Sequence, residues 1–267
     1  LIRYLYFIMS NNCVYKIGID IGSTTLKLVV LNNDNEIVYK NYVRHKADLT
    51  NILINELDNL KNISSDFKIN ITGSAGMGVA ERLKVQFTQE VIAAIEVIKR
   101  FYPETHTLID LGGEDAKIVF FEDGRLPDIR MNGSCAGGTG AFIDQMADLL
   151  NITIPEMSLI AEQHTKIYNV ASRCGVFAKT DVQNLIARNI PKADISMSVF
   201  HTVALQSITS LVHGNKIRPN VLCIGGPLTF IPSLRKQFQH LLHLSDIEII
   251  LPDNSEYFPA LGCALLI

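Results

Sequence analysis

Apolar and polar positions in the amino-terminal part of the chain predict a meander of strands. Two apolar runs, Tyr15–Ile21 and Leu26–Leu31, flank a small turn at Gly22–Thr25. The polar stretch Asn32–Asn35 marks the next turn, and Glu36–Val43 has the alternation of a half-buried strand. The three strands would therefore follow one another in a single sheet.

Helical spacing of apolar residues appears after this meander. Leu49–Leu60 and Gln89–Phe101 both have it, and Pro103 closes the second helix. Between them, Lys68–Thr72 has the composition of a buried strand. We interpret the glycines that follow this strand mainly as turn glycines: Gly73, Gly76 and Gly78.

The opening pattern occurs a second time near the middle of the chain. Thr107–Gly113 is a strand that runs into a glycine turn, Ala116–Glu122 is a second strand, and Asp123 with the next glycine makes a hairpin turn. The same order of strand, acid, glycine and strand is thus found near 17–31 and 107–121. A duplication of this kind predicts two similar α/β domains with a ligand cleft between them.

The carboxyl-terminal part adds a strand, two helices and the predicted domain boundaries. The strand Val221–Ile224 ends in Gly225-Gly-Pro227 and precedes a helix over Ser233–Leu242, and a closing helix from near Glu256 would cross back to the first half. The expected domains are 14–105 plus 255–267 and 106–254, with 1–13 as an amino-terminal extension.

Composition limits the classes of function. The 267 residues are 48% hydrophobic and 19% charged with a net charge of −3, which favours a folded protein and gives no general footprint for nucleic acid. No apolar run approaches the roughly 18 residues of a membrane helix. Five cysteines, an odd number, fit a reducing cytoplasm. We expect Met9 rather than Leu1 to be the initiator, and the apolar carboxyl end predicts one module of a longer protein.

Two glycine turns carry the residues of a phosphate site. Asp20 ends a strand, Gly22 allows close backbone approach, and Ser23, Thr24 and Thr25 offer hydroxyl and N–H groups to phosphate oxygens. An isolated turn of this kind is often only a tight β-turn. The chain has no P-loop and no dinucleotide fingerprint, so phosphate binding would depend on the duplicated turns.

The second turn offers the same elements. Asp110 precedes Gly112 and Gly113, and two such acids can hold Mg²⁺ through waters. Lys27, on the strand after the first turn, would reach a terminal phosphate. These residues predict a site for a magnesium-bound nucleotide, with Asp20 and Asp110 organising Mg²⁺ and the attacking water.

Two cysteines each stand in front of a predicted helix. Cys135 precedes the helix Ala141–Leu150 and Cys174 precedes Ala178–Arg188, where backbone N–H groups and the helix dipole stabilise a thiolate. Two cysteines are half the usual ligand set of an iron–sulfur cluster, and the chain has no Cys-x-x-Cys to supply the rest. A twofold dimer would supply four thiolates.

The other chemically active side chains have ordinary structural explanations. We expect Cys223 and Cys263 to be core residues and Cys13 to be incidental. None of the seven histidines has metal-ligand spacing with another, and we interpret them as surface or capping residues, including His45, His106, His164 and His201. We expect the charged residues near the predicted helices to lie on solvated faces: Glu156, Glu162, Lys179 and Asp181.

The motifs together resemble a known superfamily. Asp20-Ile-Gly-Ser-Thr, Asp110-Leu-Gly-Gly and Gly225-Gly-Pro are similar to the phosphate-1, phosphate-2 and adenosine motifs of the actin, hexokinase and heat-shock chaperone ATPases, which have ribonuclease H-like domains. The resemblance covers nearly everything from Val14 to Ile267. It implies that Gly225, Gly226 and Pro227 let adenosine lie against the backbone.

The two cysteine stretches resemble one branch of this superfamily. They are similar to the activators of 2-hydroxyacyl-CoA dehydratases and the related benzoyl-CoA reductase subunits, the BadF/BadG/BcrA/BcrD-type ATPases. This chain has Glu114 where many dehydratase activators have glutamine. Cys135 and Cys174 match the cluster ligands of these activators by position.

The resemblance implies an activity and its partners. It implies a homodimer that shares one [4Fe–4S] cluster and uses ATP to drive single low-potential electrons to a dehydratase or reductase partner. A ferredoxin or flavodoxin-like protein would be the electron donor. Two other functions stay open: a small-molecule kinase of the N-acetylhexosamine type, and a nucleotide-dependent regulatory module without a redox task.

Overall fold

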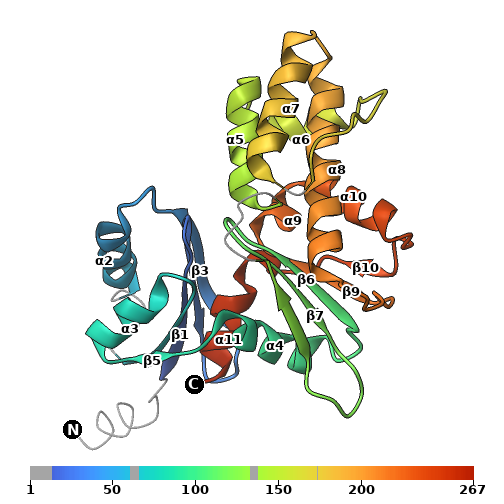
Figure 1. Ribbon diagram of the computed structural model, residues 1–267. Coiled ribbons are helices and arrows are strands. Elements are labelled where there is room, and N and C mark those ends of the chain that lie inside the picture. Colours follow the sequence, from blue (N-terminus) through green and yellow to red (C-terminus); the bar gives the residue numbers. More distant parts are fainter. Residues whose placement is uncertain (1–13, 61–65, 133–137, 173) are drawn as a thin grey trace, which may run out of the picture. The chain divides into compact units, whose positions relative to one another are not determined.

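The computed structural model describes residues 14–60, 66–132, 138–172 and 174–267. They divide into two compact units (Figure 1). Unit 1 comprises the described residues up to Pro103 together with Tyr257–Ile267, and unit 2 is Glu104–Glu256. Each unit has a five-stranded mixed sheet with helices packed on it, so the predicted α/β class is confirmed.

The sheet of unit 1 begins with the predicted meander. Its strands are β1 (Tyr15–Ile21), β2 (Thr25–Leu31), β3 (Ile37–Arg44), β4 (Phe67–Thr72) and β5 (Gln86–Phe87), in the order β3-β2-β1-β4-β5. The first two pairs are antiparallel, whereas β4 and β5 are added in parallel. Strand β2 is buried along most of its length, which explains its continuous apolar run.

Four helices complete unit 1. They are α2 (Leu49–Leu60), α3 (Gly76–Leu83), α4 (Glu90–Phe101) and α11 (Phe258–Leu265), the last after a 3₁₀ turn at Ser255–Tyr257. Helix α11 contacts α4 and strands β1, β2 and β4, which brings the end of the chain back to its beginning.

Glycines let α11 approach both strand β1 and helix α4 closely. A Cβ at Gly18 would lie 1.8 Å from the carbonyl oxygen of Ala260, and one at Gly262 would lie 1.8 Å from that of Ala93. Both positions therefore exclude a side chain, since real Cβ atoms do not approach backbone so closely.

The interpretation of Gly76 and Gly78 as turn glycines is wrong. Both belong to α3, and Gly76 packs against the side chain of Ile71. Gly73 does lie in a turn, with φ +95°. A glycine at a helix start has the same local sequence signal as one in a turn, which explains the error.

The sheet of unit 2 repeats the topology of unit 1. Its strands are β6 (Thr107–Leu111), β7 (Ala116–Phe120), β8 (Asp128–Met131), β9 (Val221–Ile224) and β10 (Ile249–Ile250), in the order β10-β9-β6-β7-β8. As in unit 1, the first hairpin is antiparallel and the strand on its other side is parallel. The duplication inferred from the sequence is thus a duplication of structure.

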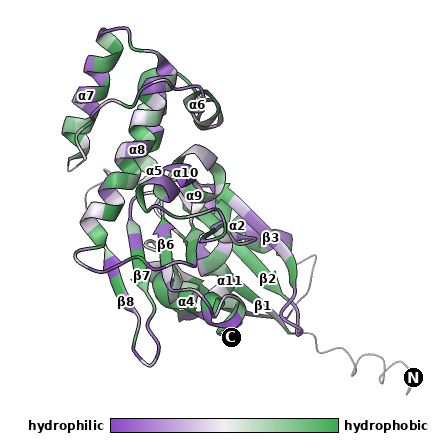
Figure 2. Ribbon diagram, turned by 90° about the vertical axis from the view of Figure 1, so that its right-hand side faces the viewer, coloured by the Kyte–Doolittle hydropathy of each residue, from purple (hydrophilic) through white to green (hydrophobic). Residues whose placement is uncertain are grey.

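A layer of helices distinguishes unit 2. Helix α8 contacts α5, α6, α7 and α10, and most of its residues on every side are buried. Figure 2 shows the strands of both sheets coloured largely as hydrophobic. The helices of this unit are α5 (Gly140–Leu150), α6 (Ile154–Ala161), α7 (Gly175–Ala187), α8 (Lys192–Leu211), α9 (Gly226–Phe230) and α10 (Pro232–Leu241).

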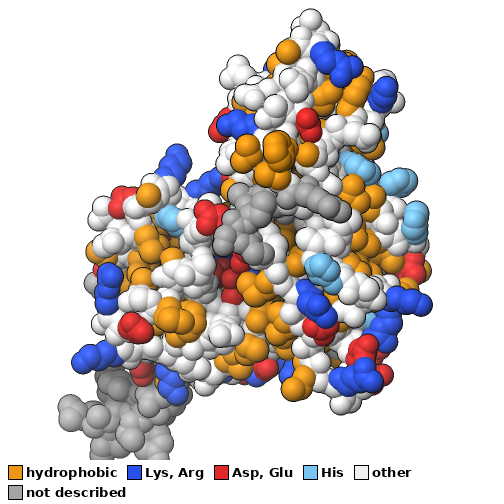
Figure 3. Space-filling model, viewed as in Figure 1, with side chains coloured by type: hydrophobic (Ala, Val, Ile, Leu, Met, Phe, Trp, Pro, Cys, Tyr) orange, Lys and Arg blue, Asp and Glu red, His pale blue; other side chains and the backbone are white. Residues whose placement is uncertain are grey.

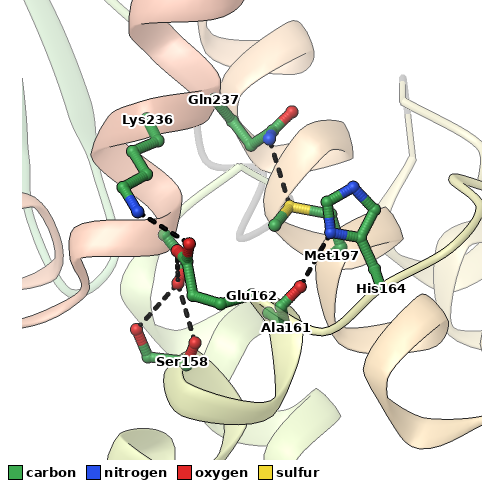
Figure 4. A network of polar contacts seen from close by, with 8 residues as sticks. Ser158, Ala161, Glu162, His164, Met197, Lys236 and Gln237 are labelled. Atoms are coloured by element: carbon green, nitrogen blue, oxygen red, sulfur yellow. Dashed lines mark hydrogen bonds and ion pairs between the residues drawn. The ribbon is translucent and has the colours of Figure 1, made fainter.

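A polar cluster joins the end of α6 to α10 (Figure 4). The Oγ atom of Ser233 lies 2.7 Å from the carbonyl oxygen of Ser158 and 2.8 Å from Glu162 Oε1, and its hydroxyl can donate to either acceptor. Lys236 Nζ lies 2.6 Å from Glu162 Oε2, and its hydrogen bond holds the pKa of Glu162 below the ordinary value. Glu162 is therefore a cross-link between helices rather than a purely solvated residue.

The cysteines of the two cores behave as predicted. Cys223 on β9 and Cys263 on α11 are fully buried, which confirms that they are core residues. Burial raises the pKa of each thiol to about 12, so neither is a thiolate at neutral pH. In the described part of the chain no helix is both long and apolar enough to span a bilayer.

Candidate functional site

The two hairpins that carry Asp20 and Asp110 have matching geometry. Asp20 on β1 is in register with Lys27 on β2, and Asp110 on β6 is in register with Lys117 on β7. Each turn is closed by the same backbone hydrogen bond: Gly22 N donates to Thr25 O at 3.0 Å, and Gly112 N donates to Asp115 O at 2.8 Å. The acid, the glycine and the lysine thus occupy equivalent places in the two units.

Asp20 is buried and held between a lysine and a glycine. Lys27 Nζ donates to its Oδ2 at 2.8 Å, and the side chain of Asp20 is 1% exposed. Its other oxygen, Oδ1, is buried and has no hydrogen-bond partner among the described residues. A Cβ at Gly73 would lie 2.4 Å from that oxygen, so glycine is needed there.

The ion pair affects Lys27 strongly. Burial disfavours the charged ammonium, but attraction to Asp20 and the hydrogen bond to it outweigh this effect and raise the pKa of Lys27 above its ordinary range. Lys27 is therefore a permanent cation beside the first acid.

Asp110 has a corresponding arrangement with a second carboxylate. Lys117 Nζ lies 3.8 Å from Asp110 Oδ2 and 2.9 Å from Asp115 Oδ2, and the lysine side chain is 3% exposed. Gly225 follows β9 with φ +90°, and a Cβ there would lie 2.1 Å from the carbonyl oxygen of Leu111 and 2.9 Å from Asp110 Oδ1. Gly225 in unit 2 therefore has the place of Gly73 in unit 1.

The start of α5 is attached to the second glycine turn. Gly140 N donates to Gly112 O at 3.0 Å, and Ala141 N donates to Gly113 O at 2.7 Å. On the strand side, Ala116 N donates to Asn132 Oδ1 at 2.8 Å and Asn132 N donates to Ala116 O at 3.0 Å. Cys135 lies outside the described residues, but the described residues on both sides of it are hydrogen-bonded to the hairpin of Asp110.

Cys174 is the N-cap residue of α7. It is partly exposed, and Ala178 N donates to its carbonyl oxygen at 3.0 Å. Val176 and Phe177, in the first turn, are 72% and 66% exposed. Figure 3 shows hydrophobic side chains gathered on the part of unit 2 that carries α5 and α7. Cys174 is thus placed at the positive end of a helix dipole.

The described residues of one chain do not complete a metal site. Among them, no group of three or more His, Cys, Asp or Glu side chains could hold a metal ion. A four-cysteine cluster that includes Cys174 would therefore need ligands beyond the described part of a single chain.

Comparison with known proteins decides the family. The model of the BadF/BadG/BcrA/BcrD ATPase family matches residues 17–266. The chain belongs to this ATPase family. Its paired hairpins and the two predicted cysteines all lie within the matched residues.

The family includes relatives similar over nearly their whole length. The 2-hydroxyisocaproyl-CoA dehydratase activator of Clostridioides difficile is 30% identical over 257 residues, which cover 94% of each chain. A solved structure of the activator of the 2-hydroxyisocaproyl-CoA dehydratase from Clostridium difficile with bound ADPNP has a TM-score of 0.82, 28% identity, and coverage of 95% and 94%. Component A of the Acidaminococcus fermentans (R)-2-hydroxyglutaryl-CoA dehydratase has a TM-score of 0.84, 28% identity, and coverage of 95% and 97%.

In this BadF/BadG/BcrA/BcrD-type ATPase, the other residues that we predict to bind nucleotide lie in or next to the turns that follow the strands. Thr25 is buried and Glu114 is exposed. The amides of Gly22 and Gly112 close their turns through hydrogen bonds to Thr25 O and Asp115 O. The remaining predicted positions are partly exposed: Ser23, Thr24, Gly113, Gly225, Gly226 and Pro227.

Sequence reasoning missed two residues at these turns. Lys117 follows Asp110 at the spacing that separates Lys27 from Asp20, and comparing the two copies position by position would have found it. His45 is buried, so the surface interpretation is wrong for it: its Nε2 donates to Gly22 O at 3.1 Å and its Nδ1 accepts from Ala47 N at 3.3 Å. It holds the first turn in place.

Asp181 has a structural partner instead of a purely solvated position. Its Oδ2 accepts from Ala171 N at 2.9 Å, which fastens the segment before Cys174 to α7. Lys179 is exposed, as the sequence predicts.

Proposed function

We propose that this chain hydrolyses ATP to drive single low-potential electrons to a 2-hydroxyacyl-CoA dehydratase or a benzoyl-CoA reductase-like partner. Membership of an ATPase family and the names of the relatives support this activity. The observation that carries it is the set of hydrogen bonds between the hairpin of Asp110 and the residues that flank Cys135. A nucleotide that alters this hairpin would act on the residues that flank a predicted cluster ligand.

Asp20 and Asp110 are the proposed Mg²⁺-organising acids. Mg²⁺ keeps most of its waters, and a carboxylate oxygen that lacks a hydrogen-bond partner suits such a water. Asp20 Oδ1 is an oxygen of this kind among the described residues. Hydrolysis needs mainly positioning and neutralisation of charge, which the two acids and Lys27 supply.

The phosphates would lie against the two glycine turns. The hydroxyls of Ser23 and Thr24 and the backbone of Gly113 are partly exposed there. The adenosine would lie on Gly225, Gly226 and Pro227, where φ +90° at Gly225 removes any side chain from the backbone surface.

Cys135 and Cys174 of two chains are the proposed ligands of one [4Fe–4S] cluster. Such a cluster supplies one-electron redox chemistry at low potential when bound. Cys174 fits a ligand role because it is partly exposed and stands at a helix N-terminus. A ferredoxin or flavodoxin-like donor in the cytoplasm is the corresponding source of electrons.

Helix α5 is the proposed connection from nucleotide to cluster. Its first residues donate hydrogen bonds to Gly112 and Gly113, and the helix contacts α7, whose N-cap is Cys174. Movement of the glycine turn would therefore displace both helices that follow the predicted ligands. A sugar-type kinase or a regulatory module without redox function would not need cysteines at these helix starts.

Electron delivery can be measured with the dehydratases of the relatives. Reduced protein, mixed anaerobically with 2-hydroxyisocaproyl-CoA dehydratase or (R)-2-hydroxyglutaryl-CoA dehydratase, is expected to reduce at least one of them with Mg-ATP and neither with Mg-ADP. Stopped-flow absorbance of the cluster would follow the transfer. Transfer that is equally fast without nucleotide, or colourless protein after anaerobic iron and sulfide reconstitution, would contradict the proposed activity.

A further inference from the structure

Lys117 has no role in the proposed function so far, although its position is strongly constrained. Its ammonium is buried within 2.9 Å of Asp115 Oδ2 and 3.8 Å of Asp110 Oδ2. Burial of a lysine costs free energy unless its charge is compensated, so a lysine at this place requires a reason.

Comparison of the two units points to a ligand rather than to folding. Between the acid and the lysine, the turn residues differ: Ser23, Thr24 and Thr25 in unit 1 correspond to Gly113, Glu114 and Asp115 in unit 2. The features that match are the acid, the first turn glycine and the lysine in register with the acid. A turn alone would not require a lysine at the same place in two units of different turn sequence.

The glycines that pack against the two aspartates also match between the units. Gly73 and Gly225 both have positive φ, and both press against the aspartate of their own unit. Each lysine thus pairs with a carboxylate that has glycine backbone, without a side chain, close to its other oxygen. This is the environment in which a phosphate group and its cation can approach closely.

We propose that Lys117 is the phosphate-binding cation of unit 2 and that, without nucleotide, it neutralises the carboxylates that Mg²⁺ approaches when ATP binds. This inference rests on the proposed ATPase function and adds a residue to it. Lys27 has the same task beside Asp20. With nucleotide bound, Asp110 would face the hydrated Mg²⁺, and the flexible stem of Lys117 would let its ammonium reach a phosphate oxygen.

The exchange predicts a specific dependence on Mg²⁺. In Lys117→Met, the phosphate loses a charge-assisted hydrogen bond, so metal-free ADP should bind at least about tenfold more weakly. Binding of Mg-ADP should weaken less, because Mg²⁺ no longer competes with the ammonium for the carboxylates. The ratio of ADP affinity with Mg²⁺ to ADP affinity with EDTA should therefore rise at least threefold. Isothermal titration calorimetry measures both affinities, and a threefold change corresponds to roughly half the binding free energy of a tenfold change.

A structural role for Lys117 would give a different result. Loss of a fold-supporting ion pair would weaken ADP binding equally with and without Mg²⁺, and an unchanged ratio would overturn the inference. Lys117→Arg keeps the charge and should retain most metal-free binding. Lys16→Met is the matched control, because Lys16 is a partly exposed β1 lysine whose Nζ donates to Asn35 Oδ1 at 3.0 Å.

Two further variants keep the test decisive. If Lys117→Met does not fold, the charge-balanced pair Lys117→Met with Asp115→Asn is measured instead, and Lys27→Met repeats the experiment in unit 1. Failure of the wild-type protein to bind ADP or hydrolyse ATP would contradict the proposed function itself. If the wild-type protein binds ADP and hydrolyses ATP, but both lysine variants keep the wild-type ratio of ADP affinity with Mg²⁺ to that with EDTA, only the proposed role of the lysines would be contradicted.

Discussion

Asp110→Asn is expected to lower the rate of ATP hydrolysis about 100-fold to 1000-fold, equivalent to several kcal/mol of lost transition-state stabilisation. The neutral amide keeps the shape of the carboxylate but cannot hold the charge of a hydrated Mg²⁺. Release of phosphate from Mg-ATP under anaerobic conditions measures the effect. The iron content of the variant should equal that of the wild type, because Asp110 has no part in holding the cluster.

Asp123→Asn is the matched control for this prediction. Asp123 lies in the turn between β7 and β8 of the same sheet and is exposed. Its replacement should leave hydrolysis unchanged. Thermal unfolding of both variants separates a catalytic defect from a folding defect. Hydrolysis at near wild-type rate in both Asp110→Asn and Asp20→Asn would show that these acids do not serve the nucleotide.

Cys174→Ala is expected to abolish the cluster. The wild-type protein should contain about two irons per chain, half of a four-iron cluster in a twofold dimer. Removing one cysteine from each chain removes two of four ligands, so iron should fall to background and the brown colour should disappear. Iron and sulfide analysis after anaerobic reconstitution measures this, and Cys135→Ala should have the same effect.

Cys223→Ala is the control that distinguishes a ligand from any cysteine. Cys223 is fully buried on β9 and its thiol pKa is raised to about 12, so the variant should keep its iron. Four irons per chain in the wild type, or a cluster that survives Cys174→Ala, would exclude sharing between two chains.

Local pattern predicted the strands that lead to the site. The runs at β1, β2, β6 and β7 are apolar because those strands are buried, and the polar turns between them are short. The acids and glycines were found because they interrupt these runs at a fixed place. The burial of Cys223 and Cys263 could be predicted from their apolar sequence neighbours alone.

The helices and strands that the sequence analysis did not predict lack such a pattern. Strand β8 was not predicted because it is short and mostly exposed at the edge of its sheet. Helix α8 is buried on several sides, so its sequence has no single apolar face. The roles of Lys117 and His45 depend on register and on contacts across a turn, which one copy of the sequence does not reveal.

The most direct test of the account is whether nucleotide changes the accessibility of the cluster. Reduced anaerobic protein is treated with an iron chelator in the presence of Mg-ADP, of Mg-ATP and of neither, and the rate of iron loss is followed by absorbance. Because the hairpin of Asp110 is hydrogen-bonded to both flanks of the Cys135 stretch, the three rates should differ. Identical rates would contradict a mechanical link between ATP and the cluster.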